Sequence, residues 1–245
     1  MSPDHPGTSR ADQSAIPDTV PRYNRRPVPW VAQWSGELVR KPRPRVRHEE
    51  APAGGWRLTY RDPTDTDWWA PTSDHKPVLW RRTGTDRSGT PQYALLNTIR
   101  QRTAMTEHLC QVCGQSAAVA GGVAWLMHAI EWRHVTAPMG AVEPGWKSLH
   151  TALSTTNPPT CTNCWQIAAR MCPSIREHGA VPLTVGVVRP VGVTGDVYPM
   201  GVGRPEPRHG TFGEPEMGHM MARLLVVELD DVQVYPALTS PPPRA

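Results

Sequence analysis

Four of the five cysteines in this chain form two C-x-x-C pairs, Cys110 with Cys113 and Cys161 with Cys164. A C-x-x-C turn can bring two sulfurs onto one metal ion while backbone N–H groups stabilise the thiolates. Zn²⁺ prefers four tetrahedral ligands and accepts thiolates readily. The sequence therefore predicts one structural Zn²⁺ ion held by these four cysteines.

The residues around each pair support a metal site. Gly114 directly follows the first pair, and glycine permits the positive φ that such a turn often needs. We expect a helix to begin at the second pair, where free N–H groups and the helix dipole favour negative sulfur. A redox dithiol or an iron–sulfur cluster is the alternative, but two pairs in one chain favour metal. Cys172 stands alone, and we expect it to be a small buried apolar residue rather than a fifth ligand.

The segment between the pairs predicts a β-hairpin. Gly121 and Gly122 separate two short apolar runs, at 117–119 and 123–127. Residues 129–160 predict an irregular inserted loop. The second pair then opens a helix that should end near Gly179, because glycine suits the C-terminal end of a helix.

This order of knuckle, hairpin and helix resembles the treble-clef zinc domain, over residues 109–178. The wider stretch, residues 100–173, resembles uncharacterised actinobacterial or actinophage zinc-binding proteins with a Cys-Gln-Val-Cys-Gly knuckle and a second pair ending in Cys-Pro. The first resemblance implies the treble-clef fold, and the second implies no known activity. Because the two pairs are farther apart than is common, a different Cys₄ ribbon stays open.

The rest of the chain predicts an α+β fold with long irregular stretches. The 28 prolines and 20 glycines disfavour long regular elements, whereas ten tryptophans supply apolar area for a modest core. We expect disordered tails at 1–28 and 237–245. Between them we expect an irregular, Trp-rich β and loop region at 29–90, a helix with the zinc module at 91–179, and short β-strands at 180–236.

Local signals place several elements. Thr90 and Pro91 are suited to begin a helix, which the apolar spacing of Leu95, Leu96 and Ile99 extends to residue 108. Residues 28–39 predict a strand or a docked arm. Further strands are predicted at 56–60, 77–82, 181–193 and 224–234.

Arginine clustering, rather than net charge, favours a nucleic-acid partner. The formal charge is +4, and four thiolates with one Zn²⁺ would lower it to about +2. Residues 22–47, however, hold eight basic side chains against one acid, and prolines favour an extended backbone within residues 40–47. A solvated linker is the alternative interpretation of this segment. The arginines that we expect to contact DNA or RNA come from this segment and from the two predicted helices: Arg43, Arg45, Arg47, Arg100, Arg102, Arg170 and Arg176.

A catalytic role has one candidate residue. Some treble-clef proteins are His-Asn-His nucleases, which need a histidine base on the hairpin and a metal ion. His128 lies at the end of the second predicted hairpin strand, but Met127 before it and Trp165 after the second pair depart from the metal-binding residues usual there. We therefore predict a non-enzymatic, zinc-stabilised binding module. The alternatives are a protein–protein adaptor or structural protein of a phage or mobile element, and an active or degenerate nuclease.

The sequence also gives an expectation for location. The first ten residues are polar, unlike a secretory signal. The most apolar stretch, 117–130, is too short to span a bilayer and contains two glycines. We therefore expect a cytoplasmic protein with no membrane partner, and the sequence leaves its oligomeric state open.

Overall fold

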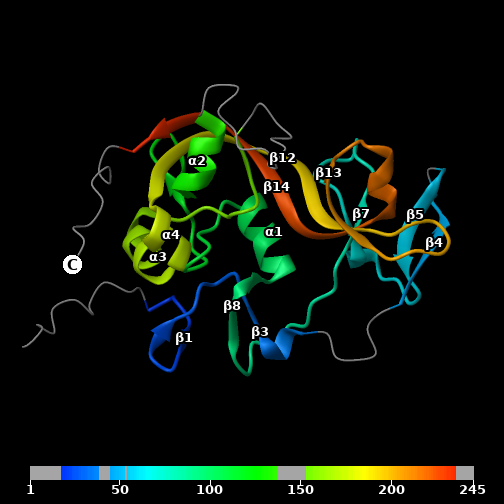
Figure 1. Ribbon diagram of the computed structural model, residues 1–245, viewed down its shortest axis with the longest axis horizontal. Coiled ribbons are helices and arrows are strands. Elements are labelled where there is room, and N and C mark those ends of the chain that lie inside the picture. Colours follow the sequence, from blue (N-terminus) through cyan, green and yellow to red (C-terminus); the bar gives the residue numbers. More distant parts are fainter. Residues whose placement is uncertain (1–17, 39–44, 53, 137–152, 236–245) are drawn as a thin grey trace, which may run out of the picture.

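Two long antiparallel strands, β12 (Ala180–Val197) and β14 (Met220–Val234), dominate the fold. The computed structural model describes residues 18–38, 45–52, 54–136 and 153–235, with only the backbone at 134 and 135. The two strands run side by side across the molecule, and most other elements lie near one of their two ends (Figure 1). The chain mixes helix and strand, and strand predominates.

The long pair belongs to an eight-stranded sheet in the order β6-β7-β14-β12-β10-β9, with β11 on β14 and β13 on β12. At one end, β10 (Gly122–His128) pairs with residues 180–185 of β12. At the other end, β7 (Val78–Trp80) runs parallel to residues 221–222 of β14. The remaining members are short: β6 (Trp68–Trp69), β9 (Ala118–Val119), β11 (Leu153–Thr155) and β13 (Glu206–Thr211).

The sheet is curled, and irregular pairing in β12 accounts for the bend. The register with β14 shifts between Pro190 and Gly192 and again between Thr194 and Gly195. Such bulges bend a strand and increase its twist. A Cβ atom at Gly195 would lie 2.1 Å from the carbonyl oxygen of Met221. Only glycine therefore allows the bent strands to approach this closely.

The largest hydrophobic cluster packs on the sheet at the β10 end and continues along the long strands. Trp125, Met127, Leu183 and Leu225 are almost completely buried in it, and Met105 joins them from the helix before the first cysteine pair. Each such side chain stabilises the fold by about 1.5–3 kcal/mol. Cys110, Cys113 and Cys164 belong to the same cluster, so the thiols lie within the core.

The helices of the described part are short: α1 (Thr98–Thr106), α2 (Ala129–Thr136), α3 (Trp165–Met171) and α4 (Pro173–His178). None of these described helices is long and apolar enough to cross a membrane. The fully buried Gln101 attaches α1 to the sheet, because its amide donates to the Leu225 carbonyl (3.0 Å) and accepts from the Leu225 N–H (2.9 Å). This reciprocal contact fixes the helix that precedes the first cysteine pair.

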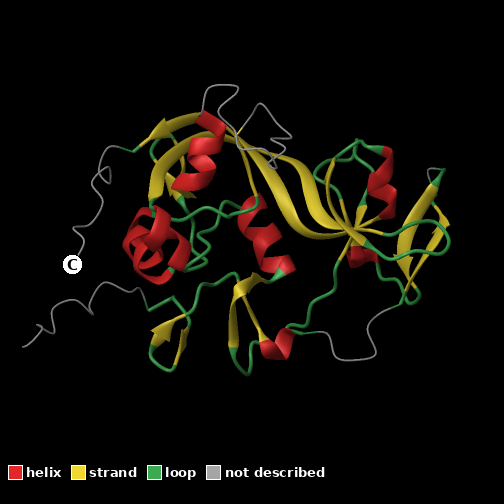
Figure 2. Cartoon of the chain, viewed as in Figure 1, coloured by secondary structure: helices red, strands yellow, loops and turns green. Residues whose placement is uncertain are grey.

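Three small ladders lie outside the main sheet (Figure 2). They pair β1 (Arg22–Tyr23) with β2 (Arg26–Pro27), β3 (Ala32–Trp34) with β8 (Pro91–Leu96), and β4 (Val46–Glu50) with β5 (Trp56–Tyr60). Short 3₁₀ turns occur at η2 (Ser35–Glu37), η3 (Asp65–Asp67), η4 (Thr162–Cys164) and η5 (Pro215–His219).

Two predictions in the first half of the chain are wrong. Residues 18–28 are not a disordered tail, because Val20 and Val28 are buried in hydrophobic clusters. The first helix does not begin at Thr90, since residues 91–96 pair with β3 as strand β8. The helix starts only after Asn97, whose side chain accepts the N–H groups of Ile99 and Arg100 and so caps α1. Residues 1–17 and 236–245 lie outside the described residues.

The second half follows the predictions more closely. The hairpin at 121–122 and the strands at 56–60, 181–193 and 224–234 are confirmed, and the last two are longer than predicted. The predicted loop at 129–160 contains α2 and β11, and residues 137–152 lie outside the described residues. The helix after the second pair is split at Cys172, which is extended because Pro173 disfavours helical geometry before it. It ends before Gly179, as predicted.

Candidate metal centre

The two C-x-x-C pairs converge on one point. The sulfur atoms of Cys110, Cys113, Cys161 and Cys164 all lie within 4.8 Å of one another, and all four are free thiols. The sulfurs of Cys113 and Cys161 are 3.8 Å apart. Zn–S bonds of about 2.3 Å in a tetrahedron place neighbouring sulfurs about 3.8 Å apart. The cluster therefore has the size that a four-coordinate metal ion requires.

The first pair lies in a tight turn, the knuckle (residues 110–114), which directly follows α1. The N–H of Gly114 donates to the Cys110 carbonyl (2.8 Å), and the N–H of Cys110 donates to the Gln115 carbonyl (2.7 Å). A further N–H, that of Val112, points at the Cys110 sulfur over 3.4 Å. Gly114 has a φ of +73°, as the sequence predicts for the residue after the pair. The backbone thus orients both thiols and stabilises negative charge on one of them.

The second pair lies where η4 leads into α3. Cys161 precedes η4 and Cys164 ends it, and the N–H of Cys164 donates to the Cys161 carbonyl (2.9 Å). The side chain of Gln111 links this segment to the knuckle, since its amide donates to the Pro158 carbonyl (3.1 Å) and to the Thr160 hydroxyl (2.9 Å). Sequence reasoning missed Gln111, because an interior residue of a C-x-x-C pair carries no signal for a partner 49 residues away.

An N-terminal arm (residues 18–38) docks on the knuckle. The N–H groups of Trp30 and Val31 donate to the carbonyls of Val112 (3.0 Å) and Gln111 (3.1 Å). A Cβ atom at Gly114 would lie 2.8 Å from the Trp30 ring, so the indole packs against a position that only glycine leaves open. The prediction that residues 28–39 form a strand or a docked arm is confirmed for 28–38, because β3 follows directly after this contact.

Charge in the cluster is unevenly distributed. Hydrogen bonding from Cys110 lowers the pKa of Cys161, the most exposed of the four thiols, to about 4. Hydrogen bonding to Cys110 and burial raise the pKa of Cys113 and of Cys164. The four thiols do not lose their protons together in the absence of a cation. Binding of a divalent ion by all four thiolates must therefore release protons.

The lone Cys172 packs among apolar residues, as the sequence predicts, but it is less buried than expected. Cys172 is half-buried and packs against the hydrophobic cluster that contains Trp165 and Ile175. It does not join the four converging thiols.

Two of the predicted nucleic-acid arginines point into the protein. Arg100 donates to both carboxylate oxygens of the fully buried Glu37 and to the Ala32 carbonyl (2.7 Å). Arg102 lies over the Trp80 ring, with its guanidinium carbon 4.6 Å from the ring centroid, and burial lowers its pKa. Both arginines hold α1 in place, which gives them a structural role that helix position alone does not reveal.

The other predicted arginines lie at opposite ends of the molecule. Arg45 and Arg47 are exposed at the start of β4, whereas Arg170 and Arg176 are exposed on α3 and α4. Figure 1 places β4 and the α3–α4 pair at the two extremes of the long axis, so these arginines do not form one continuous surface. Arg43 lies outside the described residues.

His128, the candidate nuclease base, is half-buried at the end of β10. Its Nδ1 lies 3.0 Å from the Ser174 hydroxyl, and burial, followed by the nearby His178, lowers its pKa. Within the described residues, the four cysteines are the only group of three or more metal-ligand side chains, and His128 is not part of it. Its surroundings are those of a histidine that joins β10 to α4.

Comparisons with known protein families, with curated proteins and with solved structures found no match for this chain. The candidate site therefore rests on its own geometry. The resemblance to actinobacterial and actinophage proteins stays a prediction.

Proposed function

We propose that the four cysteines hold one structural Zn²⁺ ion and that this ion stabilises a binding module without catalytic function. The convergence of the four thiols is the observation that carries the proposal. An all-thiolate tetrahedral set is typical of structural zinc, which has no open position for a substrate, or of iron–sulfur centres. Elemental analysis of the purified protein separates these metals. Iron with inorganic sulfide in place of zinc would contradict the proposal.

The order of elements supports a treble-clef-like arrangement. The knuckle is followed by the β9–β10 hairpin, and the second pair lies at the start of α3. The residues between the hairpin and the second pair would then be an insertion into this module. A cytoplasmic location accompanies the proposal, because thiols stay reduced there.

Nucleic acid is the proposed partner, contacted through the basic segment that ends in Arg45 and Arg47. Both side chains are exposed at one extreme of the long axis, where a polyanion can reach them. A salt titration of oligonucleotide binding tests this, with Arg45→Gln/Arg47→Gln as the variant. Arg189→Gln is a matched control, because Arg189 is an exposed arginine of β12 that pairs with Glu228 (3.4 Å). The absence of salt-dependent affinity in the unmodified protein would contradict a nucleic-acid partner.

The proposal assigns no cleavage reaction to His128. Its ring hydrogen-bonds with Ser174 and stands apart from the cysteine cluster, so a role in packing accounts for it. A nuclease assay with Mg²⁺ or Mn²⁺ should give the same background for the unmodified protein and for His128→Ala. Cleavage that disappears in His128→Ala would overturn the non-enzymatic assignment.

A further inference from the structure

A large open groove lies between the β3–β8 ladder and the β13–β14 side of the sheet. Its volume is about 1090 Å³, and its lining comes from η2, β8 and α1 on one side and from β12, β13 and β14 on the other. Pockets for small ligands hold about 300–1,000 Å³. The groove is thus at the upper limit for a small molecule, and its open form suits a segment of an extended polymer.

One part of the lining is apolar. Leu38 after η2 and Leu95 of β8 both line the groove, and each is 47% exposed. Residues 93–95 of β8 are left out of the pairing with β3, where the register shifts. Two exposed leucines on an irregular strand offer a surface on which a planar or apolar group can pack.

The other part of the lining is rich in guanidinium groups. Arg81, Arg208 and Arg223 line the groove from the end of β7, from β13 and from β14. Arg208 donates to Glu216 (3.2 Å), and Arg223 donates to Asp196, each through one nitrogen atom. Arginine has five N–H donors, so most of these donors remain available to a ligand.

Two acidic side chains, Glu37 and Asp196, are among the described residues that line the groove. Glu216 does not line the groove, and the lining acid Glu37 is buried against Arg100. Asp196 is the one other acid among the described lining residues. The exposed Arg208–Glu216 pair contributes about 0–1 kcal/mol, so an anionic ligand can exchange with it at small cost.

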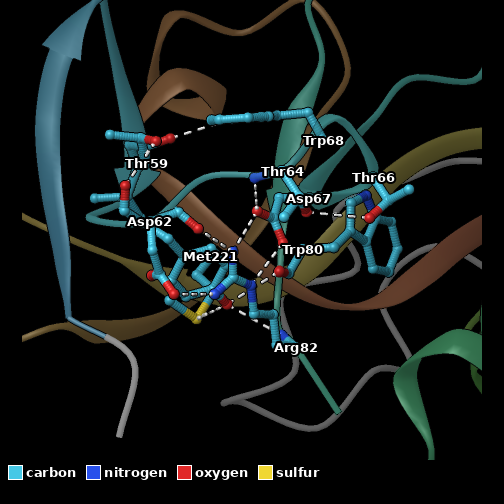
Figure 3. A network of polar contacts seen from close by, with 11 residues as sticks. Thr59, Asp62, Thr64, Thr66, Asp67, Trp68, Trp80, Arg82 and Met221 are labelled. Atoms are coloured by element: carbon cyan, nitrogen blue, oxygen red, sulfur yellow. Dashed lines mark hydrogen bonds and ion pairs between the residues drawn. The ribbon is translucent and has the colours of Figure 1, made fainter. Parts of the chain in front are cut away.

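The segment that carries Arg81 is held rigidly by its neighbour. Arg82 forms a bidentate pair with Asp67 (2.8 and 2.7 Å) and reaches the Asp62 carbonyl (2.6 Å) (Figure 3). Its guanidinium group also lies over the Tyr60 ring. The backbone N–H of Arg82 also donates to the Tyr60 hydroxyl (3.0 Å). These contacts fix the backbone from which Arg81 extends and so reduce the entropy lost on binding.

We infer that this groove binds single-stranded nucleic acid, with phosphates on Arg81, Arg208 and Arg223 and bases packed against Leu38 and Leu95. The inference deepens the proposed nucleic-acid function and rests on it. Single strands suit a groove with both basic and apolar lining residues, because their bases are free to leave the stack, whereas duplex bases are not. A phosphate chain also matches three guanidinium groups spread over two strands and a loop.

The test is a salt titration of binding to a fluorescent single-stranded oligonucleotide, with the duplex of the same sequence alongside. We expect Arg81→Gln/Arg208→Gln/Arg223→Gln to weaken binding about tenfold or more and to lower the salt slope by about 2, since each lost phosphate contact on a single strand contributes about 0.7. Arg189→Gln should change affinity less than about twofold. Leu95→Glu should also weaken binding of the single-stranded oligonucleotide. Because Leu95 is exposed, this variant should fold and can replace the triple variant if the latter does not.

Each outcome decides between the groove and the wider proposal. Unchanged affinity in the folded triple variant, with affinity lost in Arg45→Gln/Arg47→Gln, would overturn the groove and leave the nucleic-acid function standing. No salt-dependent binding by the unmodified protein would overturn both. Binding of a poly-glutamate peptide in place of the oligonucleotide, lost in the same triple variant, would reassign the groove to an acidic protein partner.

Discussion

The two ends of the β12–β14 pair are held by different chemistry. At the β10 end, four thiols converge beside the knuckle and α3. At the β7 end, Arg82 joins Asp67 and Asp62, and its ring partner Tyr60 donates to the Trp80 carbonyl (3.1 Å). Both ends combine short strands and loops with buried apolar side chains. One end adds a cysteine cluster that could hold a metal ion, and the other adds an ion-pair network.

The different chemistry should make each end sensitive to different conditions. Thiolates bind zinc only while reduced and deprotonated, so the cysteine end should respond to chelators and oxidants. The Arg82 network contains no metal ligand that a chelator removes, but it needs ionised carboxylates. Chelation, mutation and pH should thus affect the two ends separately.

Metal removal should have the largest effect. Apparent binding free energies of structural zinc are about 10–16 kcal/mol at neutral pH, which is more than the total stability of a typical domain. After chelation, we expect amide hydrogen exchange to become fast in residues 109–128 and to stay slow in β5 and β7. Equal loss of protection at both ends would show that the β7 end depends on the metal as well.

The next largest effect should come from Glu37→Gln. Glu37 is fully buried, accepts two hydrogen bonds from Arg100, and accepts the Trp34 N–H (2.8 Å). Removing its charge leaves the Arg100 guanidinium without a counter-charge, and breaking a buried pair costs about 3–5 kcal/mol. Urea unfolding should detect this loss. Glu107→Gln, at an exposed residue after α1, is the matched control and should change stability little.

Asp67→Asn should destabilise the β7 end by about 2–3 kcal/mol, because Asp67 is buried but Arg82 is partly exposed. Burial would raise the pKa of Asp67, but hydrogen bonds from Arg82 and from the Thr64 N–H outweigh it and lower the pKa. The ion pair therefore stabilises the fold above the unfolded pKa of about 4, and this contribution is lost as the pH falls through the folded value.

The measurement is urea unfolding at pH 7 and at pH 3. Asp67→Asn should lose less stability than the unmodified protein between these two values. Asp65→Asn is the control, since Asp65 lies in the same 3₁₀ turn but is exposed. A pH response of Asp67→Asn identical to that of the unmodified protein would show that the network does not titrate as proposed.

Gly114→Ala should have the smallest effect of the series, about 1–2 kcal/mol. The substitution places a Cβ atom at a positive φ and against the Trp30 ring. We expect the arm to undock while zinc stays bound, and Trp30 then becomes more accessible to a fluorescence quencher. Gly121→Ala, at a positive φ with no atom within 4 Å of the added carbon, separates backbone strain from the contact with Trp30.

The cysteine end could be predicted from the sequence because its signals are local. Each signal specifies a local turn: the C-x-x-C spacing, Gly114, the glycine pair at 121–122 and Gly179. Tertiary packing then brings these turns together. The start of α1 could not be predicted in this way. Pro91 fits a strand as well as a first helical turn, and pairing with β3 decided between them.

The ion pairs carried no comparable signal in the sequence. Arg82 and Asp67 are 15 residues apart, and Glu37 and Arg100 are 63 apart, at spacings that no helix or strand period relates. Arg100 and Arg102 were predicted to face nucleic acid because arginines on a helix are usually exposed. Their burial follows from Glu37 and Trp80, whose positions depend on the whole fold.

Zinc content per chain decides whether the four thiols hold one structural zinc ion. Elemental analysis of the unmodified protein and of Cys172→Ser should give about one zinc each, whereas Cys113→Ser should give almost none, because it removes one of four ligands. Zinc retained at full stoichiometry in Cys113→Ser, or no zinc in the unmodified protein prepared with zinc present, would contradict the account.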